Sequence, residues 1–123
     1  MLVMHTVCET HWFRRDALDA GMSEAEITLL TDYLAQNPMA GDEIAGTGGC
    51  RKLRVAGRGK GKSGGYRTVT FYSGEMLPVF LITVFSKGER ANLTQRERND
   101  LKGLTSLIVE EYRTRVAKVG EQK

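Results

Sequence analysis

Three β-favouring segments between residues 51 and 85 constrain the fold of this chain more than any other feature. They are Arg51–Val55, Arg67–Tyr72 and Leu77–Phe85. The second is built mainly from β-branched and aromatic residues. The third is apolar almost throughout, as expected of a strand that is covered on both faces. Successive strands joined by short connections predict an antiparallel meander.

Helical patterns flank these strands on both sides. Residues 11–20 predict a short helix that stops at Gly21, and the second helix begins at a capping box of Ser23 and Glu26. A third helix opens with a box of Thr94 and Glu97, and its buried side is predicted to carry four residues: Leu101, Leu104, Ile108 and Tyr112.

With an opening strand in residues 1–9, the predicted order is β-α-α-β-β-β-α. We expect one α+β domain spanning residues 1–123, in which helices cover one face of an antiparallel sheet.

Positive charge is concentrated in residues 46–74, which we call the basic segment. It contains seven cations and no acid, namely Arg51, Lys52, Arg54, Arg58, Lys60, Lys62 and Arg67. Residues 1–45 have the opposite balance, with two arginines and eight acids. Because uncompensated cations repel one another, such a segment indicates an anionic partner, although a solvated basic loop is the structural alternative.

Strand alternation divides the first β-segment into two faces. Lys52 and Arg54 share one face, while Leu53 and Val55 share the other and should face the core. The cationic face suits any polyanion, and charge alone does not separate RNA from DNA. Tyr66 and Tyr72 are candidates for stacking on a base, although half-buried packing is the alternative for such residues.

The glycine- and lysine-rich loop at residues 56–65 is superficially similar to a nucleotide-binding P-loop. A P-loop must lead into a helix whose N-terminal amides meet the phosphates. Here the residues that follow, from Tyr66 to Val69, predict a strand. The glycines instead allow the backbone to approach a phosphodiester chain closely.

The same residues offer a chemistry for RNA cleavage, in which the 2′-hydroxyl of the substrate is the nucleophile. Arg54 and Arg67 cannot lose a proton and would stabilise the charge that develops on the phosphate. Crowding by other cations lowers the pKa of a lysine, so Lys60 or Lys62 could transfer protons.

Other site types find little support. Cys8 and Cys50 are expected to be reduced thiols, and neither they nor His5 and His11 show the spacing of metal ligands. We expect no cofactor. The N-terminus lacks the features of a secretion signal, and the longest apolar run is too short to span a membrane, so a soluble cytoplasmic protein is expected.

Three blocks, at residues 46–55, 57–67 and 83–94, resemble in their order the HigB branch of the RelE toxins. The resemblance implies a small antiparallel sheet packed against helices and ribosome-dependent cleavage of messenger RNA. It also implies neutralisation by an antitoxin, for which a HigA-like helix-turn-helix protein is expected.

The resemblance extends the set of candidate residues. It places working cations at Lys52, Arg54 and Arg67 and, after the strand that ends at Phe85, at Lys87 and Arg90. Together with the residues chosen from charge and aromatic character, the candidate catalytic residues are Arg54, Lys60, Lys62, Arg67 and Lys87, and the candidate RNA contacts are Arg51, Lys52, Arg58, Tyr66 and Arg90. Gly88 and Thr94 stand where RelE has an arginine and a tyrosine, which leaves the proton-transfer groups open. A ParE-like toxin with another target and a non-catalytic nucleic-acid-binding regulator are the alternative functions.

Overall fold

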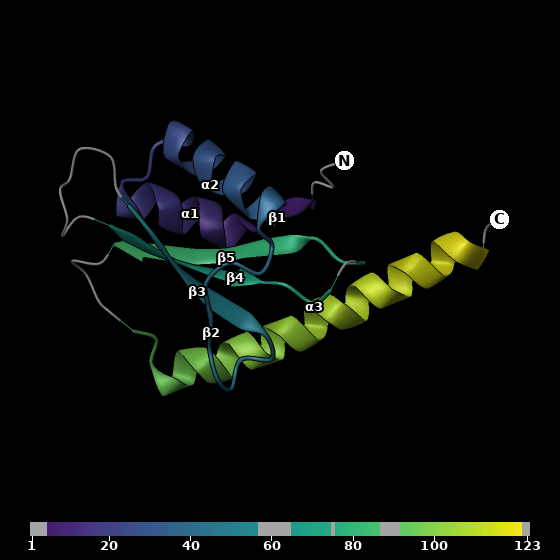
Figure 1. Cartoon of the computed structure of the whole chain (residues 1–123). Coiled ribbons are helices and arrows are strands. Elements are labelled where there is room, and N and C mark those ends of the chain that lie inside the picture. The colour runs from purple at the N-terminus through teal and green to yellow at the C-terminus, as the bar shows by residue number, and fades with distance from the viewer. Residues whose placement is uncertain (1–4, 57–64, 75, 87–91, 122–123) are drawn as a thin grey trace.

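The computed structural model describes residues 5–56, 65–74, 76–86 and 92–121, with side chains in the last range described as far as Arg113. In chain order the elements are β1 (Val7–Glu9), α1 (His11–Ala20), α2 (Glu24–Gln36), β2 (Asp42–Glu43), β3 (Cys50–Val55), β4 (Tyr66–Phe71), β5 (Val79–Ser86) and α3 (Gln95–Glu121). This order confirms the predicted α+β fold and adds the two-residue strand β2 (Figure 1).

The five strands form one sheet in the order β1-β5-β4-β3-β2. β3, β4 and β5 pair antiparallel, as the meander predicted. β1, however, pairs parallel with β5 through Val7 and Val79, so the sheet is mixed and not antiparallel throughout. A parallel pair requires a long crossover connection, which the intervening helices and strands provide.

Helices cover both faces of the sheet, whereas the sequence led us to expect them on one face only. α1 and α2 lie on one side of the strands and α3 lies on the other (Figure 1). β4 and β5 are buried along most of their length, so each needs apolar cover above and below. Two core clusters result, one around Phe13 and Leu34 and the other around Val69 and Leu101.

Local capping fixes where the helices begin. The side chains of Ser23 and Glu26 each accept a hydrogen bond from the other's backbone N–H, at 3.1 and 2.9 Å, which confirms the predicted capping box of α2. Thr94 and Glu97 form the same arrangement before α3, at 3.1 and 2.8 Å. α1 ends at Gly21, whose φ of 80° suits glycine.

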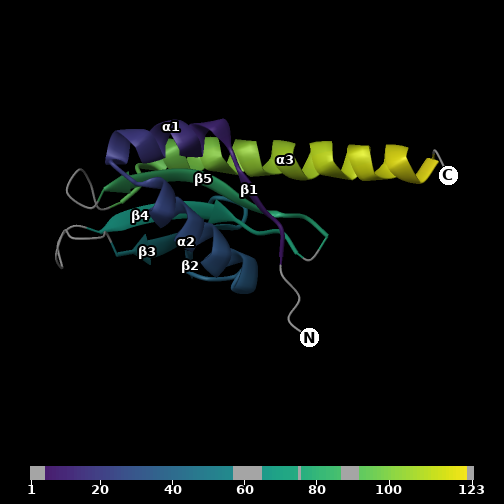
Figure 2. The same cartoon turned by 90° about the horizontal axis from the view of Figure 1, so that it is seen from above.

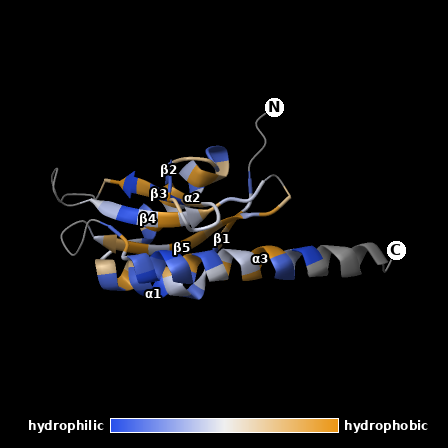
Figure 3. Ribbon diagram, turned by 90° about the horizontal axis from the view of Figure 1, so that it is seen from below, coloured by the Kyte–Doolittle hydropathy of each residue, from blue (hydrophilic) through white to orange (hydrophobic). Residues whose placement is uncertain are grey.

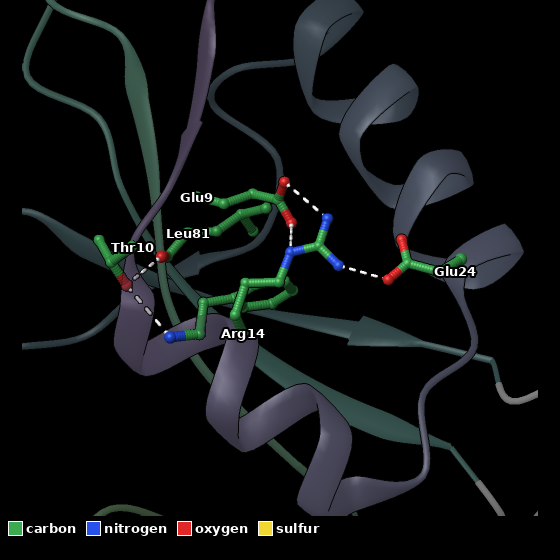
Figure 4. A network of polar contacts seen from close by, with 6 residues as sticks. Glu9, Thr10, Arg14, Glu24 and Leu81 are labelled. Atoms are coloured by element: carbon green, nitrogen blue, oxygen red, sulfur yellow. Dashed lines mark hydrogen bonds and ion pairs between the residues drawn. The ribbon is translucent and has the colours of Figure 1, made fainter.

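A polar network joins β1 to both N-terminal helices (Figure 4). The Arg14 guanidinium contacts Glu9 at 3.0 Å and Glu24 at 2.6 Å. Thr10 caps α1, and its hydroxyl donates to the Leu81 carbonyl oxygen of β5 at 2.8 Å. The network therefore holds α1 and α2 in position over the sheet.

α3 crosses the opposite face and continues beyond the edge of the sheet (Figure 2). The coloured part of α3 in Figure 3 is largely hydrophilic, whereas β5 is hydrophobic over most of its length. Within the described residues, no helix combines the length and the apolar character needed to cross a membrane.

Candidate nucleic-acid interface

β3 and β4 place two arginines directly opposite one another. Arg54 is the cross-strand partner of Arg67, so both side chains leave the same face of the sheet, the face that α3 covers in part. Opposite residues in an antiparallel pair have Cβ atoms about 5 Å apart, and like charges there are destabilising. Because two like charges in this position do not stabilise the sheet, the arginine pair indicates a role in binding an anion.

Arg67 is the buried member of the arginine pair. Its side chain is only 7% exposed, and its Nη1 atom is buried without a hydrogen-bond partner among the residues that the structure describes. On its other side, Arg67 is paired with Phe85 of β5, which is also buried. A buried guanidinium nitrogen without a partner is costly, and a phosphate oxygen would supply the missing acceptor.

Lys52 adds a third cation to this face, two residues before Arg54 on β3. Its Nζ atom donates to Oδ1 of Asn92 at 3.1 Å, just before α3 begins. Leu53 and Val55 pack against the core on the opposite face, which confirms the predicted division of the strand. Lys52, Arg54 and Arg67 together form what we call the cationic face.

Arg51, a predicted RNA contact, points away from the cationic face. Its Nη1 atom donates to the carbonyl oxygens of Met39 and Gly41, each at 3.1 Å. These two bonds brace the loop that follows α2. In this position Arg51 supports the edge of the sheet and does not extend the cationic face.

The two tyrosines considered for base stacking are engaged in packing. Tyr66 is 1% exposed, and its hydroxyl lies 3.2 Å from the Glu26 carboxylate and 3.3 Å from the Gly21 carbonyl oxygen. Burial, together with the charge of Glu26, raises the pKa of Tyr66. Stacking of a base on Tyr66 does not fit this position, because the core covers the ring. The ring of Tyr72 meets that of His5 edge to face, at 5.3 Å between centroids.

Five of the predicted site residues lie outside the part of the chain that the structure describes: Arg58, Lys60, Lys62, Lys87 and Arg90. The strand ends that lead into those segments belong to one end of the sheet, because Val55 is paired with Tyr66 and Tyr66 with Ser86. The arginine pair lies one position inside that end of the sheet.

Arg98 is a further cation that the sequence reasoning did not select. Its Nε atom is buried and has no hydrogen-bond partner in the described part of the chain. It lies three residues before Leu101 and therefore on the side of α3 that turns toward the sheet. The signal was present in the sequence, since Arg98 occupies the position one helical turn before the apolar stripe that begins at Leu101.

The described residues contain neither a cluster of metal-ligating side chains nor a disulfide. No cluster of three or more histidine, cysteine, aspartate or glutamate side chains in them is arranged to hold a metal ion. Cys8 and Cys50 are both free, as predicted.

Comparison with models of known protein families identifies a family to which the chain is similar. The model of the RelE toxin of the RelE/RelB toxin-antitoxin system matches residues 5–123, which is nearly the whole chain. The match includes every strand and helix that builds the cationic face.

Proposed function

The chain belongs to the RelE toxin family, and from that premise we propose that it is an endoribonuclease that cleaves messenger RNA on the ribosome and thereby inhibits translation. We assign it to the HigB branch of the family and to the cytoplasm, where ribosomes are found. Membership in the family implies an antitoxin partner, which we propose to be a HigA-like helix-turn-helix protein.

The observation that carries this proposal is the buried arginine of the arginine pair. Arg67 has a guanidinium nitrogen without a partner in the described structure, and Arg54 stands opposite it on the same face. Two neighbouring guanidinium groups can bind the non-bridging oxygens of one phosphate. Because Arg67 is buried within the sheet, little reorganisation of its guanidinium is needed when negative charge develops, whereas the Arg54 side chain is exposed and can close on the phosphate.

The proposed reaction uses the nucleophile that RNA carries. The 2′-oxygen attacks the neighbouring phosphorus while a base removes its proton, and the bond from phosphorus to the 5′-oxygen breaks as an acid protonates the leaving group. The products are a 2′,3′-cyclic phosphate and a 5′-hydroxyl. Arg54 and Arg67 stabilise the additional charge on phosphorus but cannot transfer protons.

Lys60 and Lys62 are the candidates for proton transfer, and they lie outside the described residues together with Lys87, which is proposed as a further catalytic cation. A ribosomal template would align the substrate in a site of this kind, because proximity contributes a large share of the rate. We propose that Lys52, whose Nζ atom donates to Asn92, binds the RNA backbone beside the arginine pair.

The test is cleavage of a defined messenger RNA by the purified protein, with and without ribosomes. We expect cleavage products only when ribosomes are present, with a cyclic phosphate at the new 3′ end. RNA binding without cleavage would instead support a nucleic-acid-binding regulator. Inhibition of DNA supercoiling by gyrase, without RNA cleavage, would support a ParE-like target.

A further inference from the structure

Arg98 of α3, like Arg67, has a buried guanidinium nitrogen without a hydrogen-bond partner in the described part of the chain. For Arg98 this nitrogen is Nε. The two terminal nitrogens of its guanidinium are not buried in this way, and no hydrogen bond or ion pair engages them among the described residues. An anion that approaches from solvent can therefore bind the terminal nitrogens.

The geometry of α3 turns Arg98 toward β3. Residues seven apart in an α-helix lie on nearly the same line, two turns apart, so Arg98 and Thr105 share one side of α3. The Thr105 hydroxyl donates to the Thr47 carbonyl oxygen at 3.0 Å, and the Thr47 hydroxyl accepts from the Cys50 backbone N–H at the start of β3. Leu104, on the other flank of α3, instead lines a hollow beside α1.

Arg98 also lies toward the end of the sheet that carries the arginine pair. α3 begins at that end, as Figure 1 and Figure 2 both show. The two turns from Thr105 back to Arg98 cover about 10.5 Å, which equals the length of about three residues of a strand. Measured from the start of β3, this distance reaches the stretch from Lys52 to Arg54. The Lys52 Nζ atom donates to Asn92 at 3.1 Å, so the beginning of the helix contacts this part of the strand.

Lys52 and Arg98 thus form a second cationic position beside the arginine pair. Lys52 and Arg54 point to the same face of β3, and the two residues between them and their neighbours in the chain separate them by about 6.6 Å along the strand. This spacing is close to the separation of consecutive phosphates along an extended single strand of RNA. Lys52 and Arg98 are both half-buried, so packing holds part of each side chain while its charged end stays accessible.

We propose that Arg98 binds a phosphate, and that together with Lys52 it holds the backbone phosphate next to the one bound by the arginine pair. The identity of the ligand as RNA rests on the proposed function. The arginine pair binds the phosphate at which the chain is cut, whereas Lys52 and Arg98 bind one that does not react. Their contacts are equal in the substrate and in the transition state, so they raise affinity and alignment more than the rate of the bound substrate.

The probes are two short RNAs that differ by one phosphate, a dinucleotide and a trinucleotide of 2′-O-methyluridine without terminal phosphates. Methylation removes the nucleophile, so neither RNA is cleaved. We would titrate each into the full-length protein and measure affinity by NMR. We expect the wild-type protein to bind the trinucleotide about tenfold more tightly, the scale of one charge-assisted hydrogen bond. Arg98→Met should lose most of this preference and should bind the dinucleotide as the wild type does.

Arg96→Met is the matched control on the same helix. Arg96 is exposed, and residues two apart in a helix do not share a side, so Arg96 is directed away from Arg98. We expect this variant to keep the preference for the trinucleotide. Equal loss in both variants would indicate a general effect of charge and overturn the proposal. A wild-type protein without the preference, or Arg98→Met with the preference intact, would overturn it as well.

Stability and a charge-retaining variant separate a phosphate contact from a structural role. Arg98→Met should unfold at a temperature no lower than the wild type, because methionine keeps the apolar stem and removes a buried nitrogen without a partner. Arg98→Lys keeps a point charge and should retain a preference of at least about threefold. A lower unfolding temperature in Arg98→Met, together with equally weakened binding of both RNAs, would assign Arg98 a structural role and refute the proposal.

Cleavage of messenger RNA on ribosomes is measured separately. Arg98→Met should raise the protein concentration that gives half the maximal rate about tenfold and keep the maximal rate within about threefold of the wild type. A maximal rate that falls about a hundredfold at an unchanged half-saturating concentration would place Arg98 at the reacting phosphate and contradict the proposal. If Arg98 governs trinucleotide binding in a protein that cleaves no messenger RNA, the proposed activity fails and the second phosphate position stands. Wild-type cleavage, with the trinucleotide preference unaffected by Arg98→Met, refutes the second position alone.

Discussion

Arg67 combines two properties that proteins usually keep apart, a full positive charge and burial within a sheet. Arg67 is the second residue of β4 and stands opposite Arg54, and its Nη1 atom is buried with no partner in the described structure. A buried guanidinium nitrogen without a hydrogen-bond partner costs free energy, and replacing buried charged groups with apolar residues of similar volume is often neutral or stabilising. A residue kept in such a position at the expense of stability is a strong candidate for function.

We therefore predict opposite effects of Arg67→Met on stability and on activity. The free energy of unfolding should stay the same or rise by about 1 kcal/mol, because methionine fills the site without a desolvated charge. RNA cleavage should fall about a hundred- to a thousandfold, the usual effect of losing one preorganised charge stabiliser. Denaturant unfolding and a ribosome-coupled cleavage assay measure the two quantities.

Single lysine changes provide the comparison for Arg67. Lys60→Ala and Lys62→Ala should each reduce cleavage about tenfold, since two neighbouring lysines can replace one another as point charges. If either lysine variant abolished cleavage while Arg67→Met retained most of it, the roles would be reversed. That lysine would then be a proton-transfer group that its neighbour cannot replace.

Cys50 gives a prediction about pH. Burial raises the pKa of its thiol from 9.0 to about 11, although a hydrogen bond with Thr47 acts in the opposite direction. Between these two values the unfolded chain loses a proton that the folded protein keeps, so stability falls as pH rises. The loss should approach about 2–3 kcal/mol by pH 11.

The measurement is denaturant unfolding at several pH values from 8 to 11. Cys50→Ala should be less stable overall but should show a shallower decline above pH 9. Tyr66, whose pKa is also raised, contributes a decline of the same sign that begins higher, so the difference between wild type and Cys50→Ala is the informative quantity. Identical slopes in the two proteins would show that the thiol does not hold its proton.

At the scale of elements, the capping box before α3 fixes the helix that covers the second core cluster. Thr94→Ala removes the side chain that accepts from the Glu97 backbone, and should lower the free energy of unfolding by about 1 kcal/mol. Thr94→Ser keeps the hydroxyl and should change stability by only a few tenths of a kcal/mol. Thermal unfolding of the three proteins tests this, and equal destabilisation by alanine and serine would contradict a capping role.

Elements whose signals are local could be predicted from the sequence, and those that depend on distant contacts could not. The helix starts at Ser23 and Thr94 follow from side chains three residues apart, so both capping boxes were recognised. β2 consists of two exposed acidic residues and exists because it pairs with β3. The parallel pairing of Val7 with Val79 likewise joins distant segments, and no local pattern encodes it.

The same distinction applies to the candidate site. Alternation along β3 correctly separated Lys52 and Arg54 from Leu53 and Val55, because it depends only on strand geometry. The burial of Arg67 and Tyr66 could not be predicted, since it depends on how β5 and the helices cover β4. Tyr66 was considered as a surface aromatic, but Glu26 of α2 supplies its hydroxyl with a buried partner.

Across the whole molecule, charge is separated along the chain in a way that should govern RNA binding. Residues 1–45 hold eight acids and two arginines, whereas the basic segment holds seven cations and no acid. Such an arrangement orients the protein toward a polyanion through the end of the sheet that carries the arginine pair. Affinity that comes from neutralising phosphates depends on salt, because binding releases counterions.

We therefore predict that the logarithm of RNA affinity falls linearly with the logarithm of salt concentration, with a slope of about −0.7 for each phosphate contacted on a single strand. Lys52, Arg54 and Arg67 would together account for a slope of about −2.

Arg54→Ala should make the slope shallower by about 0.7, because a phosphate contact is lost. Arg51→Ala is the matched control on the same strand, and it should leave the slope unchanged, since Arg51 is directed to the carbonyl oxygens of Met39 and Gly41. Fluorescence anisotropy with a labelled RNA at several salt concentrations measures these slopes. An affinity that does not change with salt would show that the cationic face is not the RNA-binding surface. Equal effects of Arg54→Ala and Arg51→Ala on the slope would show that RNA contacts do not depend on whether an arginine lies on the cationic face.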